Sequence, residues 1–303
     1  MHKRVYFIIN PAAGKPSPIL YTLNQQLSTC GIKWEMGVTN KENIDKLLRQ
    51  ADEFRADLLG IYGGDGTIAE VAHKNLDRPR SLPMAILPGG TANILSLELG
   101  IPQEVTEAAR LITEGDAQLR SVDIARINDR HFLTRAGFGL ESKMVEGASQ
   151  AMKNQMGNLA YTISAVRAVI DSDLINFSLS LDGHQIRTKG VACVIANCGN
   201  IGVPGVTLSP VEIDDGELDV FIFREKNFST FFAAVRNIVS ANDIEVENTD
   251  VLQHWRSRHI SIDTDPVTKA QFDGQLLDES TIKVDLLEHK ARILVPATRG
   301  DQR

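Results

Sequence analysis

The chain up to Gly115 alternates short apolar runs with stretches of helical periodicity, and this alternation constrains the fold more than any other feature of the sequence. The apolar runs predict strands at Arg4–Ile9, Ile32–Val38, Ala56–Tyr62 and Met84–Leu87. The helical spacing predicts helices at Tyr21–Thr29, Lys41–Phe54, Ile68–Asn75, Ala92–Leu99 and Gln103–Thr113. Because strands that alternate with helices at this spacing usually pair in parallel, we expect a doubly wound parallel α/β sheet.

After Gly115 the pattern changes to short strands joined by tight turns. Two turn signals, Asn128-Asp129 and Asp182-Gly183, predict hairpins. The strands predicted around these turns and in the later apolar runs are Leu119–Ile127, His131–Ala136, Phe177–Leu181, Gln185–Ala196, Leu218–Phe223, His259–Thr264, Ala270–Phe272, Thr281–Leu286 and Ala291–Val295. Helical stretches at Leu159–Ile170 and Phe228–Val239 interrupt them. Such a run of short strands predicts an antiparallel β-sandwich.

The change in pattern divides the 303 residues into an α/β domain of residues 1–120 and a β-sandwich domain of residues 121–303, with the C-terminal tail free to pack back on the first domain. The net charge of −7 argues against a general nucleic-acid binder, which is usually basic. The 3 cysteines have no metal-binding spacing, and no run approaches the roughly 18 apolar residues of a membrane span. We therefore expect a cytoplasmic protein.

Glycine-bearing loops follow three of the predicted strands of the first domain. They are Asn10-Pro11-Ala12-Ala13-Gly14-Lys15, Gly63-Gly64-Asp65-Gly66-Thr67 and Pro88-Gly89-Gly90-Thr91-Ala92-Asn93. Glycines let a ligand approach the backbone, and a following helix offers free N–H groups to phosphate. A single glycine pair fits equally well a tight turn with Asp65 or Thr67 as the helix N-cap. Three such loops at the carboxyl edge of one parallel sheet favour a nucleotide phosphate site.

Two acidic turns lie in the second domain. The segment 212–217 precedes the strand Leu218–Phe223, and Asp273-Gly274 follows the strand Ala270–Phe272. Asp-Gly pairs commonly form hairpin turns, which would explain each turn by itself. In phosphoryl transfer the same residues have a chemical use, because one aspartate accepts the proton of the acceptor hydroxyl and other carboxylates bind a cation.

The loops and turns appear in an order that resembles the diacylglycerol kinase catalytic-domain family, in particular its soluble bacterial lipid kinases, and also sphingosine and ceramide kinases. The resemblance spans residues of about 4 to 290 and implies ATP in the cleft between an α/β domain and a β-sandwich. By motif match, the residues implied to bind ATP are Asn10, Thr39, Gly63, Gly64, Asp65, Gly66, Thr67, Glu70, Gly90, Thr91 and Asn93.

The resemblance also implies roles for acidic residues. Asp273 matches the family's proton acceptor. Asp215 matches a structural Mg²⁺ site, to which Glu212 and Glu217 contribute through backbone carbonyls, and Asp123 matches a Mg²⁺–water network near the phosphates. The sequence departs from the family pattern at three positions, where Ala69, Ile94 and Gln275 replace polar or acidic residues.

The implied acceptor is a lipid alcohol such as diacylglycerol, a sphingoid base or ceramide, taken from a membrane surface by a peripheral enzyme. The two helical stretches of the second domain fit either a core or an acyl-chain contact. Two other functions stay open: a kinase for a soluble acceptor such as NAD, and a nucleotide or lipid sensor without catalysis. A homodimer is also left open.

Overall fold

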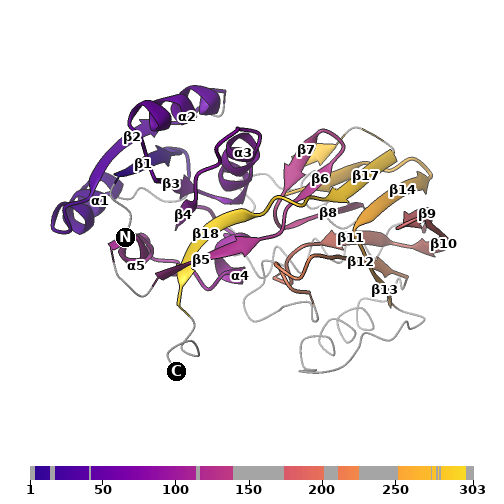
Figure 1. The fold of residues 1–303 in the computed structure, drawn as a ribbon. Helices are drawn as coiled ribbons and strands as arrows, with labels where there is room; N and C mark the ends of the chain where they lie inside the picture. Colours follow the sequence, from indigo (N-terminus) through magenta and orange to yellow (C-terminus); the bar gives the residue numbers. More distant parts are fainter. Residues whose placement is uncertain are drawn as a thin grey trace. The chain divides into compact units, whose positions relative to one another are not determined.

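The computed structural model describes residues 4–13, 18–40, 42–113, 117–138, 174–200, 211–224, 252–273, 275–277, 279 and 281–297. The chain divides into two units, one of residues 1–122 with 289–303 and one of residues 123–288 (Figure 1). The helices predicted at Leu159–Ile170 and Phe228–Val239 lie outside the described residues. No helix in the described part of the chain is long and apolar enough to cross a bilayer.

The described residues of the first unit form a six-stranded sheet in the order β2-β1-β3-β4-β18-β5. Its strands are β1 (Arg4–Ile9), β2 (Lys33–Val38), β3 (Leu58–Gly63), β4 (Met84–Pro88), β5 (Ala117–Val122) and β18 (Ala291–Pro296). Strands β1 to β4 and β18 run parallel, and β5 pairs antiparallel with β18. Every residue of β3 and β4 is buried, as expected for parallel strands that are covered on both faces.

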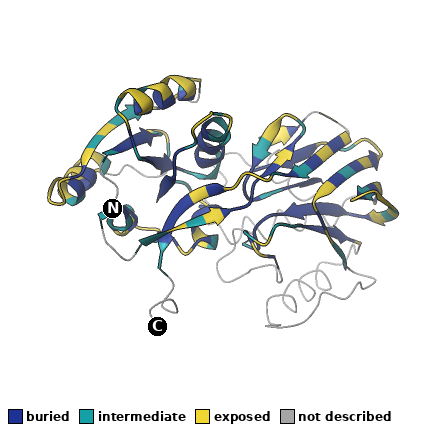
Figure 2. Ribbon diagram, in the orientation of Figure 1, coloured by how far each residue is buried: buried dark blue, intermediate teal, exposed yellow. Residues whose placement is uncertain are grey.

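Amphipathic helices accompany this sheet. They are α1 (Ile19–Ser28), α2 (Ile44–Glu53), α3 (Asp65–Leu76), α4 (Ile94–Glu98) and α5 (Val105–Thr113). In α2 the buried residues Ile44, Leu47, Leu48 and Ala51 recur at helical spacing, which places one apolar stripe inward and leaves the other face exposed (Figure 2). The predicted α/β architecture of the N-terminal region is confirmed.

Two segments predicted as strands of the second domain pair in the first sheet instead, and the later of them agrees with the expectation that the C-terminal tail is free to pack back on the first domain. The predicted strand Leu119–Ile127 is broken, so that its first part is β5 and only Ala125–Ile127 (β6) enters the second unit. The predicted strand Ala291–Val295 is β18, which pairs with β5 along its whole length and with β4 at Ile293. An apolar pattern in the sequence indicates that a strand has a buried face, but it does not indicate which sheet the strand joins.

The second unit is a sandwich of two antiparallel sheets. Within the described residues their orders are β10-β9-β14-β17-β6-β7 and β13-β12-β11-β8-β15-β16. The new strands are β7 (Arg130–Phe132), β8 (Arg135–Phe138), β9 (Ile175–Leu181), β10 (His184–Gly190), β11 (Ala192–Ala196), β12 (Leu218–Phe223), β13 (Leu252–Ser257), β14 (His259–Asp265), β15 (Ala270–Phe272), β16 (Gln275–Leu277) and β17 (Thr281–Leu286). Phe138 of one sheet and Phe177 of the other pack with ring centroids 6.2 Å apart in the shared core. The predicted β-sandwich is confirmed.

The chain crosses between the two sheets at places where the sequence predicted one continuous strand. The predicted strand Gln185–Ala196 is two strands, β10 and β11, in different sheets. The predicted strand His131–Ala136 is likewise divided into β7 and β8, with the crossing at Leu133-Thr134. Strands β13 and β16 were not predicted. The crossing at Leu133-Thr134 removes backbone N–H groups from the sheet ladders, and these groups need other acceptors.

Candidate functional site

The described residues of the predicted phosphate loops meet at the carboxyl edge of the parallel strands β1, β3 and β4, which are neighbours in the sheet. Gly14 and Lys15 of the first loop lie outside the described residues. Asn10, directly after β1, donates its side-chain amide to Thr67 Oγ1 at 2.8 Å. The backbone N–H of Asn10 donates to Tyr62 O at 2.9 Å, and that of Gly89 donates to Gly63 O at 2.8 Å. Hydrogen bonds therefore join each of these loops to its neighbour.

The glycines at two of these positions are required by the close approach of the loops. A Cβ on Gly90 would lie 2.5 Å from Gly64 Cα and 2.8 Å from Asn93 Oδ1, and a Cβ on Gly64 would lie 3.1 Å from Gly90 Cα. Both loops would have to move apart to accept any side chain. Asn93, which has a positive φ of 51°, accepts the Gly90 N–H at 2.8 Å and so holds the second loop in shape.

Gly66 has no such packing requirement. It lies in the first turn of α3, and its φ is not in the left-handed region. Apart from its chain neighbours and the backbone of its own helix turn, no heavy atom of the described residues lies within 4 Å of a Cβ placed there. In a helix, glycine costs up to about 1 kcal/mol relative to alanine. The missing side chain leaves open space beside the N-terminus of this helix.

The helix N-terminus at this point has no side-chain cap. The N-cap is Gly64, so the capping role suggested for Asp65 or Thr67 is wrong. Asp65 Oδ1 instead accepts the Leu95 N–H at 3.1 Å and ties the start of α3 to α4. The first N–H groups of a helix have no partner within it, so an uncapped start can bind an anion.

Other residues implied to bind ATP lie at the same edge of the sheet or on α3. Thr39 is buried directly after β2, where its N–H donates to Ile9 O at 2.9 Å. Glu70 is half-buried on α3, and Thr91 is exposed in the loop after β4. Of the positions that depart from the family pattern, Ala69 is buried on α3 and Ile94 begins α4. The predicted nucleotide residues of this unit therefore lie at the carboxyl edge of the sheet or on the helix that begins there.

In the second unit, the Asp273 side chain binds the chain crossing between β7 and β8. Its Oδ2 accepts the Leu133 N–H at 2.8 Å, and its Oδ1 accepts the N–H groups of Thr134 at 3.0 Å and Arg135 at 3.2 Å together with the Thr134 hydroxyl. Burial raises the pKa of the Asp273 carboxyl, although these hydrogen bonds act in the opposite direction. Asp273 is thus a buried carboxylate with a fixed orientation and a raised pKa.

Asn197, which the sequence analysis did not single out, connects two of the predicted acidic residues. Its fully buried amide donates to Asp123 O at 2.9 Å and to Leu133 O at 2.8 Å, and its backbone N–H donates to Thr134 O at 2.9 Å. The segment that holds Asp273 is therefore joined to Asp123. Neither a lone asparagine after an apolar strand nor a single threonine such as Thr134 within an apolar run indicates such a contact in the sequence.

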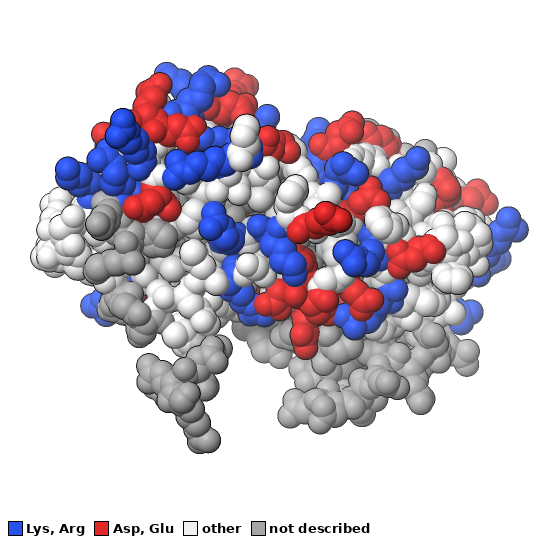
Figure 3. All heavy atoms as spheres, in the orientation of Figure 1, with Lys and Arg blue, Asp and Glu red and all other residues white. Residues whose placement is uncertain are grey.

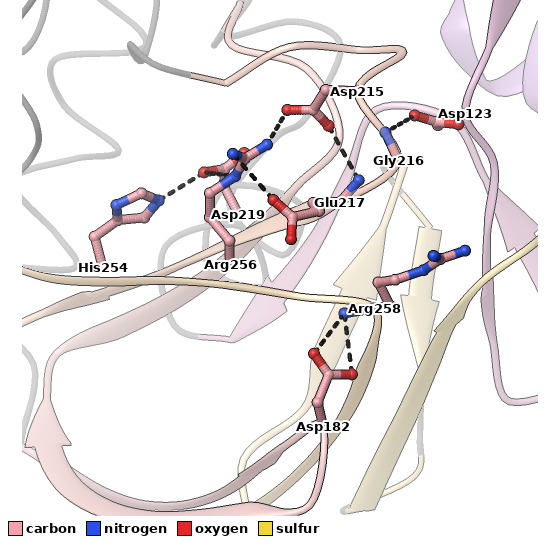
Figure 4. A network of polar contacts seen from close by, with 9 residues as sticks. All are labelled: Asp123, Asp182, Asp215, Gly216, Glu217, Asp219, His254, Arg256 and Arg258. Atoms are coloured by element: carbon pink, nitrogen blue, oxygen red, sulfur yellow. Dashed lines mark hydrogen bonds and ion pairs between the residues drawn. The ribbon is translucent and has the colours of Figure 1, made fainter.

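The acidic turn before β12 is joined to Asp123 and to a cation of the protein itself (Figure 4). Asp123 Oδ2 accepts the Gly216 N–H at 2.7 Å. Asp215 forms an ion pair with Arg256, and Glu217 Oε2 lies 3.0 Å from Arg256 Nη1. Burial raises the pKa of Asp215, while Arg256 and the Glu217 N–H lower it. Glu212 is exposed.

Comparisons with known proteins also divide the chain into two parts, and the second match extends over β18, which pairs in the first sheet. Residues 4–127 match the family described as "Diacylglycerol kinase catalytic domain", and residues 135–295 match the "YegS C-terminal NAD kinase beta sandwich-like domain". A Staphylococcus aureus (strain MRSA252) protein named "Putative lipid kinase SAR0780" is 28% identical over 293 residues, which are 94% of this chain and 92% of that protein. The solved structure titled "Crystal structure of a putative diacylglycerol kinase from Bacillus anthracis str. Sterne" superposes with a TM-score of 0.78 at 26% identity, covering 97% of this chain and 95% of that one.

Proposed function

The chain belongs to the diacylglycerol kinase catalytic-domain family, with a YegS-type β-sandwich as its second part, and from that premise we propose that it transfers the γ-phosphate of ATP to the hydroxyl of a lipid alcohol. Relatives of nearly the same length bear lipid kinase names. The reaction class, phosphotransfer by a kinase, follows from the family. The nucleotide, the acceptor and the residue roles are our proposal.

The observation that supports the nucleotide site best is the open space at Gly66. Neither backbone conformation nor packing against described residues requires glycine there, whereas loop packing does require it at Gly64 and Gly90. An anion at the uncapped start of α3 would need that space, since a β-phosphate or γ-phosphate approaches the backbone N–H groups closely. We assign the phosphates to this helix start and to the loops after β1 and β4.

ATP enters as its magnesium complex, because the charge on the transferring phosphoryl group needs a counter-ion. Asp123 stays the predicted carboxylate for the water shell of that ion. Asn10, Thr39, Glu70 and Thr91 stay predicted contacts to the nucleotide.

We assign the proton transfer to Asp273. Its Oδ1 already accepts three hydrogen bonds, whereas Oδ2 accepts one among the described residues, so Oδ2 has capacity for a proton. As the lipid oxygen attacks the γ-phosphorus, its O–H bond breaks toward Oδ2, the new O–P bond forms, and the bond from the γ-phosphorus to the departing ADP oxygen breaks. A carboxyl group whose pKa is raised by burial is a stronger base than an ordinary aspartate.

The acceptor lipid reaches the enzyme from a membrane surface in this proposal. On the face drawn in Figure 3, acidic and basic side chains are interspersed over the described residues.

A variant at Gly66 tests the nucleotide site. If Gly66 only forms a turn, Gly66→Ala raises the thermal unfolding temperature and leaves ATP affinity unchanged. If a phosphate uses the space, ATP affinity measured by calorimetry falls at least tenfold while the folded state is retained. Unchanged affinity would contradict the site.

Transfer of labelled γ-phosphate tests the acceptor. The purified protein is incubated with labelled ATP and Mg²⁺ together with a panel of diacylglycerol, monoacylglycerol, sphingosine and ceramide vesicles, and separately with NAD. We expect label in a lipid. Label in NAD alone would select the second candidate, a kinase for a soluble acceptor. ATP binding without any transfer would select a sensor.

A further inference from the structure

The acidic turn that the family resemblance assigns to a structural Mg²⁺ faces an arginine on the neighbouring strand. Strands β12 and β13 pair antiparallel, with Asp219 directly opposite Arg256. Side chains that are directly opposite on one face of a sheet are within contact distance. The pairing therefore places a guanidinium beside the residues that would ligate the metal (Figure 4).

Three carboxylates share this one guanidinium. Asp215 Oδ2 contacts Nη2 of Arg256, Glu217 Oε2 lies 3.0 Å from Nη1, and Asp219 Oδ1 lies 3.9 Å from Nε. All three nitrogens of the planar guanidinium thus face a carboxylate, a geometry that suits arginine better than lysine. For comparison, the Arg126 guanidinium contacts one carboxylate, that of Asp285, at 3.1 Å.

The remaining oxygen of Asp215 is also engaged. Its Oδ1 accepts the Glu217 N–H at 3.0 Å, so the carboxylate is turned back onto its own loop. Mg²⁺ requires near-octahedral oxygen ligands at about 2.1 Å. An ion at that distance from Asp215 would lie next to the guanidinium, and the like charges would repel each other. The residues as they stand do not fit a divalent cation.

One oxygen of Asp219 is engaged within the protein as well. Asp219 is fully buried, and its Oδ1 lies 2.6 Å from His254 Nε2. The His254 ring is in turn stacked on Phe221, with centroids 4.6 Å apart. A buried carboxylate is tolerated only with such partners. Asp219 therefore already has His254 and Arg256 as partners within the described residues.

We propose that Arg256 is the resident cation of the turn formed by Glu212–Glu217 and Asp219, and that this turn binds no divalent metal ion. The turn supplies the Gly216 N–H to Asp123, so the position of Asp123 is independent of metal in the absence of nucleotide. Any Mg²⁺ dependence of activity then reflects only the metal–nucleotide complex. The inference concerns the fold of the turn and holds whichever acceptor the enzyme uses.

Thermal unfolding of the full chain without nucleotide tests this assignment. We expect the unfolding temperature of the wild type to be the same with excess MgCl₂, with excess CaCl₂ and after chelation with EDTA. Arg256→Gln lowers the unfolding temperature by several degrees because it leaves carboxylates without a counter-charge. The matched control Arg126→Gln lowers it less, because a half-exposed single pair contributes little.

Two results would overturn the proposal. One is a saturable rise of the wild-type unfolding temperature with MgCl₂ that Asp215→Asn abolishes. The other is an Arg256→Gln protein as stable as Arg126→Gln. If Arg256→Gln does not fold, Arg256→Lys replaces it. This variant retains the positive charge but loses the planar guanidinium with its several N–H donors. We expect its unfolding temperature to lie below that of the wild type and still not to respond to MgCl₂.

Discussion

Thr134 donates its backbone N–H and its side-chain hydroxyl to the same atom, Oδ1 of Asp273. The two residues are 139 positions apart in the chain, and they meet because the crossing from β7 to β8 lies beside the end of β15. The hydroxyl contact stabilises the ionised form of Asp273 and lowers its pKa, against the larger effect of burial, which raises it. This contact makes the ionisation of Asp273 open to experiment.

Thr134→Val removes the hydroxyl and retains the shape of the side chain. The pKa of Asp273 then rises further, so a larger fraction of the carboxyl is protonated at low pH and cannot accept the substrate proton. We expect the acid limb of the plot of kcat/KM against pH to move to higher pH.

Thr188→Val is the control for this prediction. The Thr188 hydroxyl donates to Gln253 at 2.6 Å in the same unit, away from Asp273 in the hydrogen-bond network. Loss of the Thr188 hydroxyl removes one hydrogen bond and leaves the plot of kcat/KM against pH unchanged. A profile for Thr134→Val that coincides with the wild type would show that Asp273 is not the base.

Asp273→Asn removes the proposed base while its amide oxygen can still accept from Thr134. We expect kcat for lipid phosphorylation to fall by roughly 10²–10⁴, the usual contribution of a general base. The amide nitrogen would face the Leu133 N–H, so the variant also loses about 1–3 kcal/mol of stability. Assays below the unfolding transition, with ATP affinity measured in parallel, separate the two effects; wild-type kcat would refute the assignment.

Gly90→Ala forces the loops after β3 and β4 apart, because the new Cβ would lie 2.5 Å from Gly64 Cα. We expect weaker ATP binding together with a lower unfolding temperature. Gly31→Ala is the control, since its φ of +66° strains the backbone by about 1–2 kcal/mol without a clash among the described residues. Calorimetric titration of both variants should show lower ATP affinity for Gly90→Ala alone; equal affinities would separate this loop from the nucleotide.

Asp285 makes stability depend on pH. A hydrogen bond from His259, and then the Arg126 guanidinium, hold the pKa of Asp285 below its ordinary value. The folded-state pKa is thus below the unfolded value of about 3.9, so the stabilisation is complete above that value and is lost as the pH falls through the folded-state pKa.

Unfolding free energies of wild type and Asp285→Asn between pH 7 and pH 2 check this dependence. We expect a difference at pH 7 of less than about 1 kcal/mol, because the pair is partly exposed, and convergence in acid. The exposed Asp129→Asn serves as the reference and should show no such gap. A gap for Asp285→Asn that persists at pH 2 would contradict the assignment.

The elements of the first unit were largely predictable because their signals are local. Apolar runs bounded by glycine loops placed β1, β3 and β4 within a residue or two of their observed ends. Parallel strands end at a common edge, so the loops that begin at Asn10, Gly63 and Pro88 could be expected to meet there. The structural roles of Gly64 and Gly66 could not be predicted in this way. Gly64 is needed because another loop packs against it, whereas Gly66 faces open space.

Strand partners and side-chain pairs between distant segments were decided by the tertiary structure. The apolar pattern of Ala291–Val295 reports a buried strand, but only its pairing with β5 and β4 assigns it to the first sheet. The predicted strand His131–Ala136 contains a crossing, because the core accepts side chains from both sheets and the pattern of burial does not change there. In the same way, no residue near Asp215 in the sequence indicates its contact with Arg256, which lies 41 residues further along the chain.

The sequence by itself determined the types of the elements, the order of the two units and the loops with phosphate-binding character, since each follows from residues close together in the chain. The tertiary structure alone decided that the N–H groups of Leu133 and Thr134 turn toward Asp273 and that a guanidinium lies where a metal was expected. These contacts depend on strand register between distant segments, which is set by the packing of the whole core and is not encoded in the periodicity of any single segment.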